Sequence, residues 1–595
     1  MKPVIREYLA SLRERGELDA ILPDVLSELG YTVFSRPSRG TRQFGVDIAA
    51  VGPHGDDRVY LFSIKRGDLT RSEWNGDSNQ ALRPSLDEIF DAYIPNHLPP
   101  EHSDKRIVIC PCFGGEVVEA VAENFNGYMK TKQSDRVEFS VWNGDRLAGY
   151  LEEGLLREGL LSPGMRSSLR KSIAMSDEPD VSFAHFVRLV DAVVEAAMGT
   201  LDATRLTAAR QVSISLWMLF VWAREQGNLE SSYLASEYTL LRVWDLASDL
   251  LAKRTRASED MGLILLALVD LHNQVWEEFI GKKVLPHAAS VHAISAAIRT
   301  ASPLDVNLKL FDIMGRVALR GLWMIWSDIL TGDLPGPPAK RSRNRRIDAL
   351  ANQLSALIAA NPALLTPVAD EQAIDLSLGF VFLAACGSDD LGVWISQLVR
   401  RANHSYRSGG RFPCTLRGYA ELAQHPRADQ EGYLERVTQA SVLLPTLAFW
   451  AAALGDDRAL QTLADLKKEL LGHCTVQLWL PDEDSEPGLW RGQDGHGAAF
   501  LNIPLVPERR TILDYILRES GPDTPFAELS AVKQGLWPLV LVACRHYRLP
   551  VPPHFFNRLV ETAGRPFQAV FPIIPHSDDK SSLLGSVSYY ALMIK

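Results

Sequence analysis

Two neighbouring runs of sequence decide the fold of the N-terminal part of this chain: Gly45-Val46-Asp47-Ile48 and Val59-Tyr60-Leu61-Phe62-Ser63-Ile64-Lys65-Arg66-Gly67. Each run predicts a β-strand. The turn between them, residues 52–57, has the Gly, Pro and Asp residues that are typical of a hairpin loop. The pattern therefore predicts two adjacent strands joined as a hairpin.

This hairpin can bring three polar side chains together. Because side chains alternate along a strand, Ser63 and Lys65 share one face, and Phe62 and Ile64 point into the opposite layer. Asp47 on the first strand can then lie beside Ser63 and Lys65. A carboxylate that binds a hard cation, next to an ammonium that meets developing negative charge, suits hydrolysis of a phosphodiester.

The pattern resembles the PD-(D/E)xK nuclease superfamily and, within it, the Mrr-like restriction endonucleases. The resemblance covers roughly the first quarter of the chain. The flanking sequence follows the order of elements that the family implies: an apolar helical stripe that ends at Gly30, strands at 31–34, 106–110 and 137–142, a helix at 116–129, and a turn and helix at 143–148.

The resemblance implies catalytic roles for Asp47 and Lys65 around a Mg²⁺ ion, with Mn²⁺ as the alternative. Asp19 lies at the spacing before Gly30 where the first helix of the family often carries an acid. Ser63 departs from the family pattern, which has Glu, Asp or Gln there, and a hydroxyl is a poor ligand for Mg²⁺.

Two interpretations of Ser63 stay open. In some Ser-x-Lys restriction enzymes an acid has moved to the following helix, and Asp77 and Glu88 are the candidates for such a metal ligand here. For Glu88 the alternative is a capping role, because Ser85-Leu86-Asp87-Glu88 is a capping-box sequence. The other interpretation is a degenerate site in a domain that only binds nucleic acid or a partner.

Charge limits where DNA could bind. The 595 residues carry a net charge of −11, so any DNA contact has to come from a local basic patch. One candidate patch surrounds the hairpin, with the alternative that its loop arginines pair with Asp56, Asp57 or Asp68. A second candidate is the basic run 340–346, with the alternative of a solvated linker. The candidate DNA-binding residues of the first patch are Arg36, Arg39, Arg42, Arg66, Arg71 and Arg83.

The rest of the chain has a helical pattern. From about residue 165, segments of helical period follow one another, including 204–226, 304–330 and 431–454. We therefore expect an α/β restriction-endonuclease-like domain at 1–160, followed by a large all-α region divided into 165–335 and 345–595. The segment 481–497 is expected to be an acidic loop.

Composition and topology signals suggest a cytoplasmic protein with no membrane segment. The N-terminus is charged and shows no signal peptide, and the apolar runs 213–223 and 437–454 are predicted to be buried helices.

The expected function is a metal-dependent DNA endonuclease with a helical sensor or scaffold region, in restriction or anti-phage defence. Its expected partners are DNA and other proteins of a defence complex, with any ATPase as a separate chain. The alternative is a non-catalytic, nuclease-like DNA-binding or assembly subunit.

Overall fold

The structure, a computed structural model, describes residues 5–6, 9, 18–36, 43–53, 55–76, 81–154, 163–253, 255–298, 302–330, 345–427, 430–493, 495–521 and 524–556. Within them, an N-terminal sheet with helices precedes a large, mostly helical region, which confirms the predicted fold class. The chain divides into two compact units. One is built from Met1–Thr239 with Thr255–Leu271, and the other from Leu240–Arg254 with His272–Ser588.

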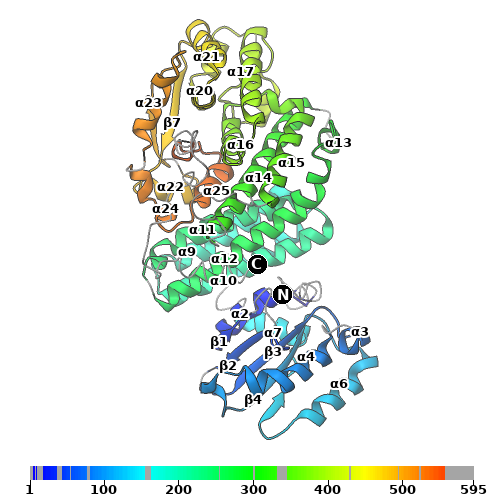
Figure 1. Cartoon of the computed structure of the whole chain (residues 1–595). Coiled ribbons are helices and arrows are strands. Elements are labelled where there is room, and N and C mark those ends of the chain that lie inside the picture. Colours follow the sequence, from blue (N-terminus) through cyan, green and yellow to red (C-terminus); the bar gives the residue numbers. More distant parts are fainter. Residues whose placement is uncertain are drawn as a thin grey trace. The chain divides into compact units, whose positions relative to one another are not determined.

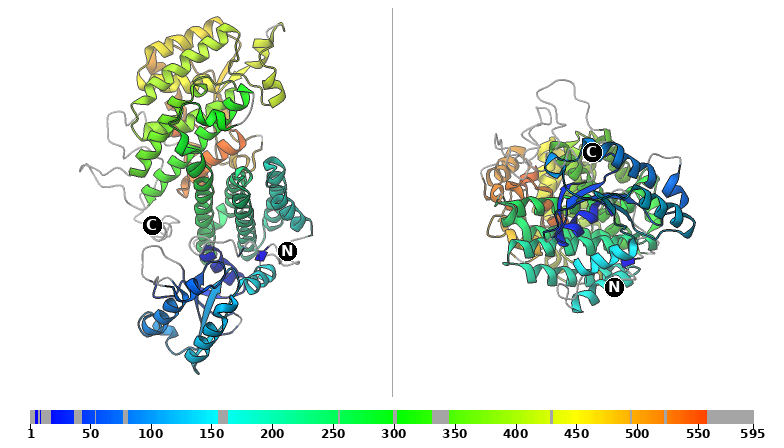
Figure 2. Two further views of the ribbon diagram at one scale, coloured as in Figure 1. Left: turned by 90° about the vertical axis from the view of Figure 1, so that its right-hand side faces the viewer. Right: turned by 90° about the horizontal axis from the view of Figure 1, so that it is seen from below.

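The N-terminal sheet has five strands in the order of the sequence. The first two pairings are antiparallel and include the predicted hairpin, whereas the last two are parallel. In Figure 1 and Figure 2 these strands stay together within the blue and cyan part of the chain. The strands are β1 (Thr32–Ser35), β2 (Ile48–Val51), β3 (Val59–Lys65), β4 (Ile107–Phe113) and β5 (Val137–Phe139).

Helices cover both faces of this sheet. Val59 and Leu61 of β3 pack in one core with Leu86 and Phe125, whereas Phe62 meets Trp142 edge-on at a centroid distance of 5.0 Å on the other face. The alternation along β3 therefore separates two apolar layers. The first layer holds α3 (Arg71–Asn75), α4 (Leu82–Glu88), the π-helix η2 (Ile89–Tyr93) and α6 (Glu119–Lys132); the second holds α2 (Asp19–Glu28) and α7 (Gly144–Gly154).

The helix α2 forms where the apolar stripe predicts it. Leu22, Val25 and Leu26 are buried, and the chain leaves the helix at Gly30 with φ of 87°. A left-handed conformation of this kind favours glycine because it has no Cβ. Between β3 and β4 the short helices α5 (Ile94–Asn96) and η3 (Pro100–His102) complete the connection.

The second part of the chain consists mainly of long helices (Figure 1). Their cores are apolar: the predicted buried run 213–223 lies in α10, and the part 443–454 of the predicted run 437–454 forms the buried helix α20. The main helices are α8 (Pro163–Ala174), α9 (Pro179–Ala197), α10 (Asp202–Gln226), α11 (Glu230–Leu251), α12 (Arg256–Trp276), α14 (Pro303–Leu330), α15 (Arg345–Ala360), α16 (Ala373–Ala385), α17 (Asp390–Ser408), α20 (Leu443–Leu454), α21 (Asp457–Glu469), α23 (Arg509–Glu519) and α25 (Pro538–Tyr547).

Shorter helices connect these elements. They are η4 (Glu277–Gly281), η5 (Leu285–His287), α13 (Ala293–Ala297), η6 (Pro362–Leu365), η7 (Asp370–Gln372), α18 (Tyr419–Ala423), α19 (Tyr433–Val437), α22 (Glu486–Arg491), η8 (Pro525–Glu528) and α24 (Ser530–Lys533). In the described part of the chain α10 alone is long and apolar enough to cross a membrane, and 89% of its apolar window is buried inside the protein.

A three-stranded sheet lies within the mostly helical region, which the sequence pattern did not predict. It is formed by β6 (Ala440–Ser441), β7 (Thr475–Leu480) and β8 (Ala498–Leu501), in that order. The continuous helix predicted over 431–454 is wrong, because β6 separates α19 from α20. The expected acidic loop 481–497 is also only partly a loop, since it contains α22.

Candidate functional site

The hairpin places Asp47 next to Ser63, as expected from the pairing. Ile48 pairs with Phe62, and the ladder continues one residue further, where the Asp47 N–H donates to the carbonyl oxygen of Phe62 at 2.8 Å. The Ile64 N–H donates to Asp47 Oδ2 at 2.7 Å. One oxygen of the carboxylate therefore also holds the two strands together, in addition to any chemical role.

Gly45 allows the backbone just before β2 to lie against α4. A Cβ at this position would lie 1.9 Å from the carbonyl oxygen of Ser85, and the φ of Gly45 is +81°. Any larger residue would therefore clash with the backbone of α4, and a side chain would also be strained in this conformation. The Gly-x-Asp pattern thus has a packing reason, because the glycine sets the distance between the start of β2 and α4.

Ser63 and Lys65 are closed off from solvent. The exposed fraction of Ser63 is 0% and that of Lys65 is 5%, and both share a face with Leu61 in the core against α4 and α6. Ser63 Oγ makes no hydrogen bond to any described residue. A buried hydroxyl without a partner costs about 1–3 kcal/mol. Such an atom is a candidate ligand contact.

The Asp47 carboxylate also lies close enough to β4 for its charge to act on Cys112. Burial raises the pKa of the Cys112 thiol, and the Asp47 carboxylate raises it further. Cys112 pairs with Ile64 across the parallel β3–β4 ladder, so this effect agrees with the hydrogen bond between Ile64 and Asp47. Burial likewise raises the pKa of Cys110, which fits a core thiol better than a nucleophile or a metal ligand.

The proposed metal ligands are not gathered into one large cluster. No three His, Cys, Asp or Glu residues within the described ranges lie close enough together to hold a metal ion. Asp19 begins α2, in the layer that covers the face opposite Ser63, and Asp77 lies outside the described residues. Mg²⁺ often binds through one or two carboxylates, with water and substrate phosphate as further ligands. Asp47 would supply one carboxylate in that sparse mode.

The capping role considered for Glu88 is wrong. The helix α4 begins at Leu82 with Ala81 at its N-cap, and the hydroxyl of Ser85 donates to the carbonyl oxygen of Ala81 at 3.0 Å. The apolar residues Leu82, Leu86 and Ile89 are buried and set the start of the helix. Glu88 is half-buried at the end of α4, and its role as a displaced ligand stays a prediction.

The predicted DNA-binding arginines have different surroundings. Arg66, Arg71 and Arg83 are exposed, and Arg66 lies 3.5 Å from Glu73. Arg36 is half-buried, and its charge acts on Asp24. Arg39 and Arg42 lie outside the described residues, as do 340–344 of the second basic run.

Two of the three acids that were suggested as partners of the loop arginines, Asp56 and Asp68, bind other groups of the domain. The carboxylate of Asp56 pairs with Arg58 at 2.8 Å and accepts a hydrogen bond from Tyr60 at 2.7 Å. These interactions hold the pKa of Asp56 well below its usual range. Asp68 accepts a hydrogen bond from the N–H of Glu116 at 2.8 Å. Asp56 and Asp68 therefore have structural roles within the domain.

Comparison of the chain with models of protein families, with curated proteins and with solved structures finds no match. The resemblance to Mrr-like nucleases therefore rests on the motif and on the order of the elements around it.

Proposed function

We propose that this chain is a metal-dependent DNA endonuclease whose catalytic residues are Asp47, Ser63 and Lys65. The observation that supports the proposal best is the hairpin geometry, in which Asp47 meets Ser63 and Ile64 at one end of a mixed five-stranded sheet. The buried hydroxyl of Ser63 without a hydrogen-bond partner is the second support. The order of the elements around the hairpin is the third.

Each residue has a distinct task in the proposed reaction. The Asp47 carboxylate would hold Mg²⁺ or Mn²⁺, which would supply charge neutralisation of the scissile phosphate when bound. The Lys65 ammonium, on the same face as Ser63, orients the attacking water and stabilises the negative charge that develops on the phosphate. The Ser63 hydroxyl donates a hydrogen bond to a phosphate or water oxygen in this space.

Access to the site requires movement. With exposed fractions of 0% and 5%, Ser63 and Lys65 cannot be reached by a DNA phosphate in the conformation of the structure. We therefore expect low activity of the isolated protein and activation by a change that opens this face of the sheet. The helical region is the proposed sensor or scaffold for that change, in restriction or anti-phage defence. DNA, other defence proteins and a separate ATPase are the proposed partners.

The test is cleavage of supercoiled plasmid and linear DNA by the full chain with Mg²⁺, Mn²⁺ or EDTA. Lys65→Met keeps the buried aliphatic stem but removes the charge, and Asp47→Asn keeps an acceptor for the Ile64 N–H. Each should slow cleavage by about 10²–10³-fold, as for the loss of one electrostatic donor. Lys130→Met and Asp57→Asn, at exposed positions, are the matched controls. Wild-type rates in both site variants would remove the catalytic assignment.

A non-catalytic DNA-binding or assembly role is the second candidate. It is favoured by Ser63 in place of a carboxylate and by the lack of a three-ligand cluster among the described residues. In that case the wild type binds DNA but cleaves none with either metal, and Lys65→Met binds equally well. If cleavage occurs, Asp77→Asn and Glu88→Gln, singly and together, test the displaced ligand. Full activity of the double variant would exclude it.

A further inference from the structure

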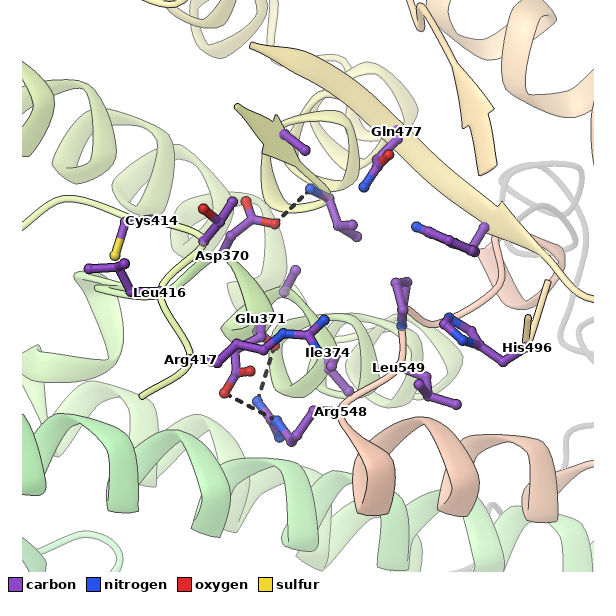
Figure 3. Close-up of a pocket in the computed structure, with 16 residues that line it drawn as sticks. Asp370, Glu371, Ile374, Cys414, Leu416, Arg417, Gln477, His496, Arg548 and Leu549 are labelled. Atoms are coloured by element: carbon purple, nitrogen blue, oxygen red, sulfur yellow. Dashed lines mark hydrogen bonds and ion pairs between the residues drawn. The ribbon is translucent and has the colours of Figure 1, made fainter. Parts of the chain in front are cut away.

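A cavity in the second compact unit combines aromatic, amide and cationic side chains. Its volume is about 150 Å³, and it is lined by the start of α16, the loop 414–417, the strands β6 and β7, and the chain after α25. Figure 3 shows Arg417, Gln477, His496 and Arg548 around the hollow. None of these residues belongs to the proposed nuclease site.

One wall of the cavity is a strand face that carries a ring and an amide. Gln477 and Trp479 are two residues apart on β7 and therefore point to the same side. The ring of Trp479 stacks on that of His496, with centroids 4.7 Å apart and planes inclined by 22°. The Gln477 amide makes no hydrogen bond within the described part of the chain. A planar ligand could stack against this wall and bond to the amide through its edge.

Two arginines, Arg417 and Arg548, also line the cavity. Arg548 donates to the two oxygens of Asp375 at 3.2 and 2.8 Å and to the carbonyl oxygen of Glu371 at 3.0 Å, so its guanidinium is fixed. Arg417 is exposed and forms no ion pair with any residue that the structure describes. An anion at the mouth of the cavity would therefore find Arg417 available and Arg548 held nearby.

The two acids of the lining have partners of their own. The Asp370 carboxylate accepts hydrogen bonds from the Ser441 hydroxyl and from the N–H groups of Val442 and Leu443, the last two at 2.8 and 3.3 Å. Glu371 lies 3.6 Å from Arg548. Both acids thus already have partners within the protein, and Arg417 is the arginine of the lining that forms no ion pair with a described residue.

We propose that this cavity binds a planar heteroaromatic ring that bears an anionic group, of the nucleoside monophosphate class. The ring lies against Trp479, its edge bonds to Gln477, and its anion meets Arg417. The size of the cavity supports one planar ring system. Its volume of 150 Å³ equals the liquid volume of about five water molecules, whereas pockets for drug-sized ligands are about 300–1,000 Å³. The phosphate then lies at the mouth. This inference does not depend on nuclease activity.

The experiment is calorimetric titration of the full chain with AMP, adenosine, inorganic phosphate and benzoate. AMP should bind at least about tenfold more tightly than adenosine or phosphate alone, because it contacts both Trp479 and Arg417. Benzoate distinguishes a general aromatic carboxylate site, and tighter binding of benzoate than of AMP would overturn the nucleotide class. Equal affinity for AMP and phosphate would overturn the role of the ring.

Three variants locate the binding. Arg417→Gln should lower the affinity for AMP by about tenfold and leave that for adenosine unchanged, since only the charge-assisted bond is lost. Trp479→Leu should weaken both ligands. Arg401→Gln, at an exposed position on α17, is the matched control and should bind like the wild type. If Trp479→Leu unfolds, Arg417→Gln decides alone, and AMP binding unchanged by it would overturn the proposal.

Discussion

Charged groups are buried both in the helical region and in the hairpin of the N-terminal sheet, but they are satisfied differently. In the helical region, Asp312 lies 2.8 Å from Arg316 and 3.0 Å from Arg545, and Asp375 binds Arg548 through both oxygens. These pairs link α14, α16 and α25. Each carboxylate therefore has a guanidinium partner supplied by the fold.

The hairpin instead contains a buried hydroxyl that the fold leaves without a hydrogen bond. The Asp47 carboxylate accepts from the Ile64 N–H, whereas Ser63 Oγ has no partner among the described residues. A paired network holds elements together, whereas a buried polar atom without a partner costs stability unless a ligand satisfies it. The difference agrees with a folding role for the Asp312 network and with the proposed binding role of the hairpin.

The largest effect should follow removal of Asp312. Arg316 and Arg545 are only 2% and 3% exposed, so Asp312→Ala leaves two buried cations without their shared acid. The free energy of unfolding should fall by about 3–5 kcal/mol, toward the lower end because Asp312 itself is 25% exposed. Urea unfolding followed by circular dichroism measures it. Asp457→Ala, in an exposed pair with Arg509, is the control and should not shift the midpoint.

An equal and small effect of Asp312→Ala and Asp457→Ala would contradict the structural role of the Asp312 network, because the buried network would then contribute no more than a surface pair.

Acid should weaken the same network. Burial of Asp312 disfavours its ionised form, but Arg316, Lys309 and Arg545 outweigh burial and hold its pKa below the usual range. A carboxyl with a lowered folded-state pKa stabilises the protein above its unfolded pKa of about 3.9, and this contribution is lost as pH falls further. The stability gap between wild type and Asp312→Asn should therefore be constant near neutral pH and shrink below about pH 4.

Unfolding midpoints at a series of pH values measure this gap. Asp370 and Asp375, whose pKa values burial raises, are present in both proteins and do not affect the difference. A gap that persists unchanged at low pH would mean that Asp312 acts through packing and not through charge.

Local signals explain how far the sequence predicted the fold. The turn residues 52–57 and the alternation along β3 fix the hairpin without reference to distant residues, and both were confirmed. The sheet of β6, β7 and β8 was missed because β6 has two residues and pairs with β7 across a long separation. The apolar residues Val476 and Leu478, which alternate with their neighbours along the chain and are buried in the structure, were the sequence signal that could have predicted β7.

The sequence likewise predicts one part of the sites and misses the rest. Hairpin pairing alone predicts that Asp47 lies beside Ser63, and the structure places it there. Sequence could not predict that Leu82 starts α4 ahead of the capping-box motif, since that depends on burial against the sheet. The cavity of Trp479, His496 and Arg417 was not predicted either, because its walls come from segments that meet only in the folded chain.

A smaller effect is expected from the exposed arginines that follow the hairpin. If Arg66, Arg71 and Arg83 contact phosphates, replacing all three by Gln should reduce the slope of log K against log salt by up to about 2.7 units, or 0.9 for each contact. DNA binding by fluorescence anisotropy at several salt concentrations measures the slope. Arg400→Gln with Arg401→Gln, on α17, is the control. An unchanged slope in the triple variant would place the DNA elsewhere, for example on the basic run 340–346.

The smallest expected effect concerns the hydroxyl that distinguishes the hairpin from the Asp312 network. Ser63→Ala removes a buried polar atom without a partner, so the free energy of unfolding without metal should rise by up to about 1 kcal/mol or stay unchanged. Ser85→Ala is the matched control, since the Ser85 hydroxyl is bonded to Ala81 and its loss should not stabilise the protein.

If Ser63 contacts bound metal or its water, Mg²⁺ or Mn²⁺ should stabilise the wild type more than Ser63→Ala. Thermal unfolding with EDTA and with each metal gives both quantities. Destabilisation by Ser63→Ala without metal would mean that the hydroxyl belongs to the fold, and the hairpin would then resemble the helical network instead of differing from it.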